Sequence, residues 1–154
     1  MNDAKPAPGL SPFAQDHIKH YLESGGKEGH LWGSARAAYG GRSQTTLLLT
    51  VTGRKSGQRL IFPLIYGQAA GGYVVVASKG GAPQHPGWYL NLLANPKVEV
   101  QVGTSRFPAV ARVLAGEERG AIWQHMVNQF PPYAEYQQNT AREIPVVMLE
   151  PAAM

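Results

Sequence analysis

Residues 45–66, TTLLLTVTGRKSGQRLIFPLIY, set the fold class of the chain. Two segments rich in β-branched and large apolar residues, Thr45–Val51 and Leu60–Tyr66, flank the glycine-framed turn Gly53–Gly57. Such residues fit a pleated strand, and a turn this short joins antiparallel neighbours because a parallel crossover needs about a dozen residues or more. The stretch therefore predicts a β-hairpin with a basic tip.

Four further segments extend the predicted sheet. In Val98–Val102 valines alternate with polar residues, which indicates a strand with one buried face. Glycine-rich turns separate the first three strands, and Gly103-Thr104 joins the fourth to the fifth, so we expect antiparallel hairpins. Strands of this number and length are typical of a small closed or partly closed barrel. The other predicted strands are Tyr73–Ser78, Arg106–Leu114 and Ile144–Leu149.

Three helices are expected to flank the six strands, which gives a mainly β (α+β) fold. The first begins after Ser11, a residue type that caps helices, with proline at the first helical position. Prolines follow the ends of the other two. We expect one domain over residues 1–154, with a mobile glycine-rich segment at Gly25–Arg42. The predicted helices cover Pro12 to about Ser24, Gly87–Ala94 and roughly Glu117–Phe130.

The composition excludes several classes of protein. The 154 residues include no cysteine, which excludes disulfides, thiol nucleophiles and thiolate metal sites. No apolar run approaches the ~20 residues of a membrane span, so we expect a soluble cytoplasmic protein. A pI near 9.5 permits contact with nucleic acid or an anionic membrane surface. The net charge of +4 is modest and no nucleic-acid-binding motif occurs, so we expect no nucleic-acid partner.

Positive charge is concentrated in one part of the chain. Between Gly29 and Val98 there are seven Lys/Arg and no Asp or Glu, whereas the other residues sum to −3. Two glycine-framed basic loops, Gly53–Gly57 and Ser78–Gly81, lie in this window where predicted strands end. Cations without acidic partners, on turns with free backbone N–H groups, suit a multiply anionic ligand. The window therefore predicts binding of a phosphorylated or carboxylated small molecule.

The second loop is the stronger candidate for binding. It follows an apolar strand and leads into a predicted helix N-terminus, where the backbone and the helix dipole favour an anion. Trp88 and Asn91 share a face of that helix and could direct a flat ring and an amide at one ligand. Ordinary explanations stay open: a solubilising hairpin tip, a long connecting loop and a core tryptophan.

No motif for metal or covalent catalysis occurs. The chain lacks the P-loop, the dinucleotide fingerprint and the G-x-S-x-G elbow, and only His17 and His20 of the five histidines share a helical face. We therefore expect no metal, and a bound organic cofactor that carries the chemistry. Tyr133 and Tyr136, if helical, would direct two phenols to one side as hydrogen-bond donors, with packed surface tyrosines as the alternative.

Together these residues resemble the deazaflavin-dependent nitroreductase family of actinobacteria over roughly residues 30 to 151. Each matching fragment is weak alone, but their combination in this order is specific. The resemblance implies a split β-barrel that binds coenzyme F420, a flavin-like ring with a lactyl-phosphate and glutamate tail. The matching segments are Leu48–Gly57, Pro63-Leu64, Val75–Ala82, His85–Leu92 and Asn95-Pro96, with Tyr133 and Ile144-Pro145.

The resemblance also implies roles for individual residues. Arg54 and Lys55 would bind the phosphate region and Lys79 the phosphate or the acidic tail. The family usually has arginine one position after Arg59, where this chain has Leu60, and a one-residue shift reverses the face of a strand. Some members have tyrosine where this chain has Phe130. Residues implied to enclose the ring are Pro63, Ala77, Ser78, Gly80, Gly81, Trp88 and Asn91, and Tyr133, Tyr136 and Ser78 are the candidate proton donors.

The implied activity is that of an oxidoreductase. It would transfer hydride from reduced F420 to a quinone, a nitroaromatic compound, or an activated enone or lactone. Two alternatives stay open: a carrier that sequesters F420 without turnover, and a split-barrel reductase that uses FMN. The physiological acceptor, the oligomeric state and peripheral contact with a membrane are also left open.

Overall fold

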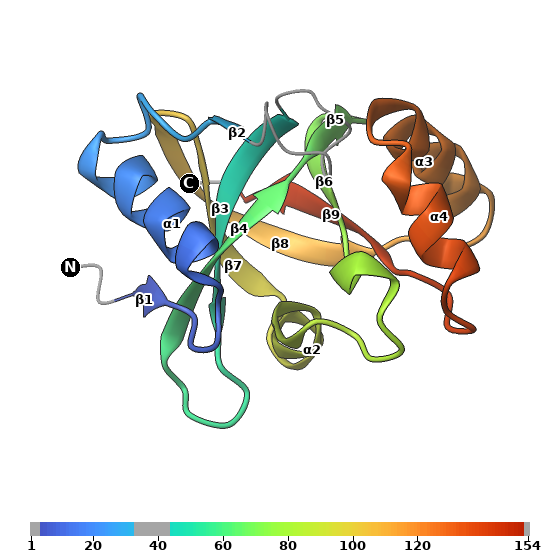
Figure 1. Cartoon of the computed structure of the whole chain (residues 1–154), viewed down its shortest axis with the longest axis horizontal. Helices are drawn as coiled ribbons and strands as arrows, with labels where there is room; N and C mark the ends of the chain where they lie inside the picture. The colour runs from blue at the N-terminus through green and yellow to red at the C-terminus, as the bar shows by residue number, and fades with distance from the viewer. Residues whose placement is uncertain (1–3, 33–43, 153–154) are drawn as a thin grey trace.

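The computed structural model describes residues 4–32 and 44–152, which form a mixed α+β fold around one sheet (Figure 1). The strands are β1 (Lys5–Pro6), β2 (Leu31–Trp32), β3 (Gln44–Thr52), β4 (Arg59–Ile65), β5 (Gly67–Ala69), β6 (Gly72–Val76), β7 (Lys97–Val102), β8 (Ser105–Val113) and β9 (Val146–Pro151). Eight of them follow the open path β1-β4-β3-β7-β8-β9-β6-β5, and β2 pairs with β3 beside it. Every described pair is antiparallel except β1 with β4.

The six predicted strands are all present, with boundaries within two residues of the prediction. The hairpins β3–β4 and β7–β8 are confirmed. The expected hairpin between the second and third predicted strands is wrong, because β5 follows β4 and pairs with β6 instead. Its two-residue turn has Ala70 and Gly71 at φ 51° and 78°, which matches the twist of a hairpin. The α+β class is confirmed, whereas no described pairing closes six strands into a barrel.

β3 is the centre of the fold because both of its faces are buried. Leu47 and Leu49 belong to the main core cluster with side chains of β6, β7 and β9. Leu48, on the opposite face, packs with Ile18 of α1 (Pro12–Glu23). None of these four side chains is more than 2% exposed. Truncation of such a leucine to alanine costs about 2–5 kcal/mol, so this strand is a rigid support for the loops at its ends.

The predicted N-terminal helix is confirmed as α1. Ser11 Oγ accepts the Ala14 backbone N–H at 3.1 Å and caps the helix. On its buried face, the Tyr21 hydroxyl accepts the Gly103 N–H at 2.6 Å and donates to the Thr46 carbonyl at 3.0 Å. The helix therefore uses its apolar face against the sheet, and peripheral membrane contact finds no support in this arrangement. No helix in the described part of the chain is long and apolar enough to cross a bilayer.

The other helices cover the far side and one end of the sheet. α2 (Gly87–Ala94) matches its predicted bounds, and α3 (Gly116–Gln129) begins and ends one residue early. A short helix, α4 (Pro132–Gln138), follows α3 directly. In Figure 1, α1 lies on one side of the strands, α3 and α4 lie together on the other, and α2 lies at the lower end. Residues 33–42 of the segment predicted to be mobile lie outside the described residues.

Candidate functional site

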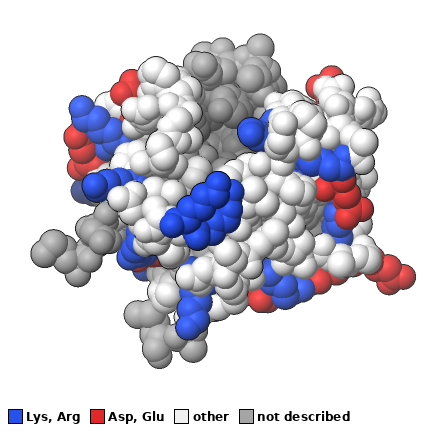
Figure 2. Space-filling model, turned by 90° about the horizontal axis from the view of Figure 1, so that it is seen from below, with Lys and Arg blue, Asp and Glu red and all other residues white. Residues whose placement is uncertain are grey.

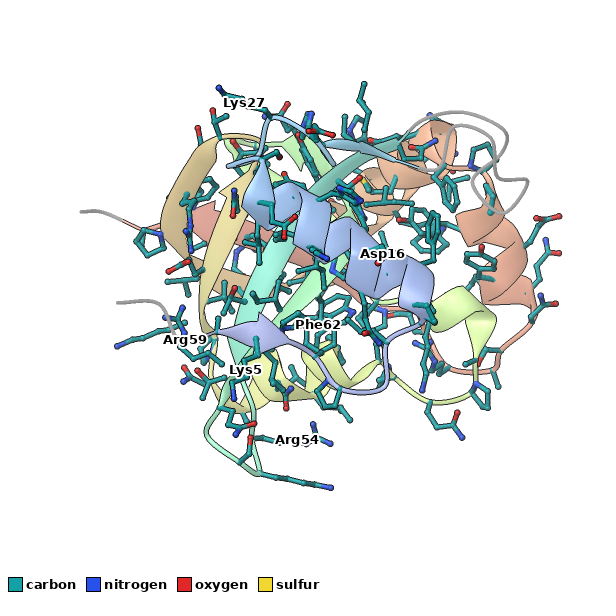
Figure 3. The ribbon with its side chains drawn as sticks, turned by 60° about the vertical axis from the view of Figure 1, so that its left-hand side comes forward. Lys5, Asp16, Lys27, Arg54, Arg59 and Phe62 are labelled. Carbon is teal, nitrogen blue, oxygen red and sulfur yellow. The ribbon has the colours of Figure 1, made fainter. Side chains whose placement is uncertain are left out.

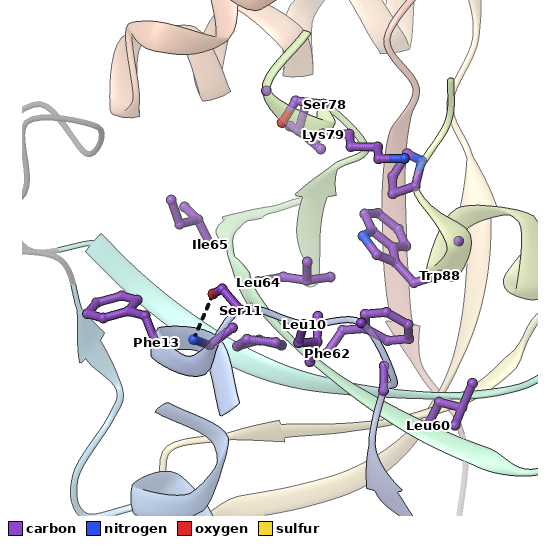
Figure 4. A pocket seen from close by; sticks show the side chains of 18 of the residues that line it. Leu10, Ser11, Phe13, Leu60, Phe62, Leu64, Ile65, Ser78, Lys79 and Trp88 are labelled. Carbon is purple, nitrogen blue, oxygen red and sulfur yellow. Dashed lines mark hydrogen bonds between the residues drawn. The ribbon is translucent and has the colours of Figure 1, made fainter. Parts of the chain in front are cut away.

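A cavity of about 860 Å³ opens between parts of the chain that are distant in sequence. It lies between the N-terminal residues 7–14, β4, the loop after β6, and α2, with side chains near α4 completing it. Figure 4 shows Leu10 and Phe62 on one side, Ser78 and Lys79 across the space, and Trp88 at the side. A cavity of this size accommodates a cofactor-sized ligand.

One wall of the cavity is apolar. Leu60 and Phe62 are two apart on β4, so both side chains lie on the cavity face of the strand. Leu10 and Phe13 reach the same wall from the N-terminal segment (Figure 4). The sequence alone does not place this segment at the cavity, because residues 7–14 carry a helix-start signal but no binding motif. They reach the cavity only because β1 pairs with β4 and α1 packs on the sheet.

The opposite edge is a polar loop with an unusual backbone. Ser78 has right-handed helical angles (φ −78°, ψ −40°), while Lys79, Gly80 and Gly81 have φ of 47°, 63° and 83°. A right-handed residue followed by a left-handed one directs successive N–H groups into one concave nest. Among the described residues, the N–H groups of Ser78, Lys79 and Gly80 donate to no protein acceptor. All three residues line the cavity, so the loop presents donors suited to an anion.

Arg142, which the sequence analysis missed, holds this loop in place. Its guanidinium donates to the carbonyls of Ala77, Ser78 and Ala82 at 3.2, 2.7 and 2.9 Å. It also lies 3.1 Å from His85 Nδ1. No sequence motif links residue 142 to a loop more than 60 positions earlier, and only the fold brings them together.

The other basic loop is the exposed tip of the β3–β4 hairpin. Arg54 and Lys55 are exposed and do not line the cavity, and Figure 3 shows Arg54 at the end of the hairpin. The Arg54 backbone N–H and Nη1 donate to Asn91 Oδ1 at 3.1 and 2.8 Å. Asn91 is buried and lines the cavity, so it connects the hairpin tip to the cavity wall.

The remaining predicted binding residues differ in position. Pro63 and Trp88 line the cavity, and Trp88 is only 5% exposed. Ala77 and Gly81 lie just behind the lining as part of the loop. Arg59 points elsewhere: its guanidinium pairs with Glu99 at 3.4 Å, next to Arg106, which contacts the same carboxylate at 3.0 Å.

Both predicted tyrosines lie on a helix, as expected. Tyr133 and Tyr136 are on α4, both line the cavity, and their ring centroids are 6.3 Å apart. Burial, and to a smaller extent the nearby Glu135 carboxylate, raises the pKa of the Tyr136 phenol. A raised pKa keeps the phenol protonated, so it can act as a hydrogen-bond donor at neutral pH. Phe130 also lines the cavity.

Charged side chains of both signs lie at the lower end of the molecule (Figure 2). Figure 2 views the end of the molecule that lies at the bottom of Figure 1, with basic side chains near its centre and acidic ones toward its edges. Within residues 4–32 and 44–152, no three His, Cys, Asp or Glu side chains come close enough to hold a metal ion. The groups of this site that can bind a ligand are therefore its backbone N–H donors, its cations and its aromatic side chains.

Comparison with known proteins places the chain in a family. A family model described as F420H(2)-dependent quinone reductase matches residues 15–151. The chain belongs to this family. It is 43% identical over 107 residues to an F420H(2)-dependent quinone reductase of Mycobacterium tuberculosis, covering 68% of this chain and 72% of that protein. The recognised resemblance to F420-dependent reductases is confirmed.

Solved structures related to this quinone reductase family agree. An F420-H2 dependent reductase, FDR-A, is 50% identical, with a TM-score of 0.64 over 68% of this chain and 93% of that one. A protein described as a domain-swapped dimer is 42% identical, with a TM-score of 0.67 over 88% of this chain and 96% of that one. The heme storage protein HutZ of Vibrio cholerae, at 17% identity and a TM-score of 0.56, shares the fold alone.

Proposed function

We propose that this chain binds coenzyme F420 in the 860 Å³ cavity and reduces a quinone there. The proposal extends to other flat electrophiles, such as nitroaromatics and activated enones or lactones. One observation carries it: in a member of the quinone reductase family, a loop faces an apolar wall across one cavity with Lys79 and three N–H groups that no described residue accepts. Such a site matches a ligand with a flat ring at one end and a charged tail at the other.

The residues present fit the coenzyme. A phosphate or carboxylate requires several donors and positive charge, which the Ser78–Gly81 loop supplies through its backbone and Lys79. The hairpin tip, with Arg54 and Lys55, would hold a more distant part of the tail. Trp88 and Pro63 would flank the ring, since both line the cavity. Arg59 is assigned a smaller part, because Glu99 already neutralises its charge.

The protein contributes orientation and electrostatics to the reaction. When bound, reduced F420 supplies the hydride. The apolar wall of β4 and the N-terminal segment would exclude water and hold a flat acceptor against the ring. Hydroxyl donors that line the cavity would stabilise the negative charge that develops on the acceptor oxygen, because they are already in position and need not reorganise during the reaction.

Three hydroxyl groups are proposed to supply the proton or the hydrogen bond. Tyr136, Tyr133 and Ser78 all line the cavity. Tyr136 is the preferred donor, because its raised pKa keeps it protonated while its ring borders the cavity. The phenol needs only to donate a hydrogen bond as charge develops, so no strong acid is required.

The proposal also covers the domain organisation, the barrel and the cellular location of the protein. We treat residues 1–154 as one F420-binding domain whose six long strands form a split barrel around the main core cluster. That cluster supports the barrel reading, because it contains buried side chains from β3, β6, β7, β8 and β9. We further propose that the protein acts in the cytoplasm.

The test is a titration followed by turnover. Reduced F420 is added to the purified protein under anaerobic conditions while tryptophan fluorescence is followed, and menadione is then added. We expect tight binding with quenching of Trp88, followed by return of the absorbance of oxidised F420. Lys79→Ala should weaken binding, whereas Lys97→Ala, an exposed change on β7, should not.

Each other outcome points to a different protein. Binding without oxidation of the coenzyme by any quinone or nitroaromatic compound would favour a carrier. Absence of F420 binding together with tight binding of FMN would replace the proposed cofactor. Equal weakening by Lys79→Ala and Lys97→Ala would contradict the site.

A further inference from the structure

The 78–81 loop, which faces the cavity, has a strained backbone with few hydrogen bonds of its own. Lys79 has a φ of 47°, a left-handed conformation that costs a non-glycine residue roughly 1 kcal/mol. Within the loop, only the Gly81 N–H to the Ser78 carbonyl (2.9 Å) and the Ala82 N–H to the Lys79 carbonyl (3.1 Å) are bonded. Such a conformation persists only if neighbouring groups fix it.

Arg142 supplies that support from one side chain. Its three nitrogens reach the carbonyls before and after the loop, with Ala77 and Ser78 at one end and Ala82 at the other. A guanidinium is planar and rigid, so its donors fix the spacing between these carbonyls. The carbonyls of Ala77, Ser78 and Ala82 are thus bonded to Arg142, whereas the N–H groups of Ser78, Lys79 and Gly80, three residues that line the cavity, donate to no described acceptor.

Arg142 also connects the loop to the tyrosine helix. Gln137 of α4 donates from Nε2 to the Arg142 carbonyl at 2.8 Å and accepts the Ile144 N–H at 2.9 Å. The loop touches the same helix directly, because a Cβ added at Gly81 would meet the Tyr136 carbonyl oxygen at 2.8 Å. These contacts therefore fix the position of the 78–81 loop relative to α4, the helix that carries Tyr133 and Tyr136.

The charge of Arg142 is not neutralised in the described part of the chain. Its partners there are three carbonyls and His85, and the adjacent carboxylate, Glu143, pairs with Arg119 at 3.4 Å. Because a guanidinium only donates, His85 Nδ1 must be an unprotonated acceptor. Arg142 therefore adds a positive charge within hydrogen-bond distance of the carbonyls of this loop.

We propose that Arg142 is the positioning residue of the coenzyme site, shaping the 78–81 loop for the anionic part of F420 and aligning it with α4. The inference rests on the proposed function. It assigns to a residue outside the cavity lining both the geometry and part of the charge of the anion site.

Arg142→Ala, Arg142→Lys and the surface control Arg112→Ala test this role. Amide hydrogen exchange is measured without coenzyme. Affinity is then measured for F420 and for the same deazaflavin without the phosphate and glutamate tail. We expect Arg142→Ala to speed exchange at Gly81 and Ala82 at least tenfold while β3 amides stay protected. Its F420 affinity should fall roughly 10- to 100-fold and its affinity for the tail-less ring less than about threefold.

Arg142→Lys keeps the charge but loses the planar fork, so it should bind F420 with intermediate affinity. Arg112→Ala should match the wild type in both measurements. If Arg142→Ala does not fold, Arg142→Lys carries the test, and wild-type exchange and F420 affinity in that variant would overturn the proposal. Equal weakening of both ligands by Arg142→Ala would also overturn it, because a general loss of structure would explain that result.

Failure of the proposed function is distinguishable from failure of this inference. A wild-type protein that does not bind F420 would refute the proposed function and the coenzyme part of the inference. Exchange at Gly81 and Ala82 would then decide separately whether Arg142 holds the loop.

Discussion

The two basic loops look alike in sequence and differ in the folded protein. Both place Lys or Arg next to glycine at the end of a strand. The tip at residues 53–57 is mostly exposed, and a Cβ at Gly57 would meet nothing within 4 Å. The loop at residues 78–82 packs against α4 and is held by Arg142. Two loops of similar sequence are therefore held by different contacts, the tip through Asn91 and the 78–82 loop through Arg142 and α4.

Local charge differs between the regions for the same reason. The acid-free stretch ends at Val98, and the next residue, Glu99, pairs with Arg59 because β7 lies beside β3. No described carboxylate pairs with Lys79 or Arg142. Counting charges along the chain therefore overstates the free charge near β4 and misses the contribution of Arg142.

The largest difference between the two loops is expected when one glycine of each loop is replaced by alanine. At Gly81, φ is 83° and the new Cβ would lie 2.8 Å from the Tyr136 carbonyl oxygen, so strain and a backbone clash add together. We expect Gly81→Ala to lower the free energy of unfolding by about 2–4 kcal/mol and to abolish F420 binding. Gly57→Ala, at φ 73° with open space, should cost only about 1 kcal/mol. Urea denaturation measures the free energy of unfolding of both variants, and equal losses would contradict the expected difference between the two loops.

The next effect concerns the two lysines. Lys79→Ala should weaken F420 binding roughly 10- to 100-fold, because a cation that lines the cavity beside three backbone donors is lost. Lys55→Ala, at the exposed tip, should weaken it only about two- to fivefold. Titrations at low and high salt sharpen the result, since the Lys55 contribution should disappear at high salt. A larger loss in Lys55→Ala would place the main anion site at the hairpin tip.

A smaller effect is expected where the two regions meet. Asn91→Leu removes the acceptor of two Arg54 hydrogen bonds and should lower the free energy of unfolding by about 1 kcal/mol. It should also weaken F420 binding a few-fold, because the tip is no longer tied to the cavity wall. Asn95→Leu, at the end of the same helix, is the matched control for F420 affinity, because the Asn95 side chain accepts the Lys97 N–H and not a group of the hairpin tip. Equal effects on F420 affinity would contradict a connecting role for Asn91.

The smallest effect is a dependence on pH. Burial, and then the Arg142 charge, lowers the pKa of His85 below 6.5, so the folded state favours the neutral ring. Its contribution to stability is therefore present above about pH 6.5 and is lost as the pH falls through the lowered folded-state pKa. Buried His17 acts in the same direction, so the comparison uses His85→Asn, which keeps an acceptor but does not titrate. We expect a smaller loss of stability between pH 7.5 and pH 5 in this variant, and an unchanged loss would contradict the prediction.

Much of the fold could be predicted from local sequence signals. Pro86 and Asn95-Pro96 fix both ends of α2, and valine alternation fixes β7. The strand β5 was missed because three residues carry too little pattern. Its place depends on α3, since a Cβ at Gly67 would collide with Met126. The sequence of a segment can predict that it forms a helix or a strand, but it does not predict which element the segment will pair with or pack against.

The candidate site shows the same division. The lining residues Ser78, Lys79 and Trp88 were predicted, because they lie within one glycine-rich segment and the helix after it. Arg142 and the N-terminal wall were not, because each reaches the site through contacts with residues far away in sequence. The sequence favoured the Lys79 loop over the Arg54 tip, and in the fold Lys79 lines the cavity whereas Arg54 lies outside its lining.

In the proposed site, the 78–80 backbone and Lys79 bind the anionic part of the coenzyme. The most direct measurement is a titration of ¹⁵N-labelled protein with F420, followed by the amide resonances of both loops. The account predicts that the largest shifts occur at Ser78, Lys79 and Gly80, with smaller ones at Arg54 and Lys55. Shifts confined to the hairpin tip, or equal shifts with the tail-less deazaflavin, would contradict it.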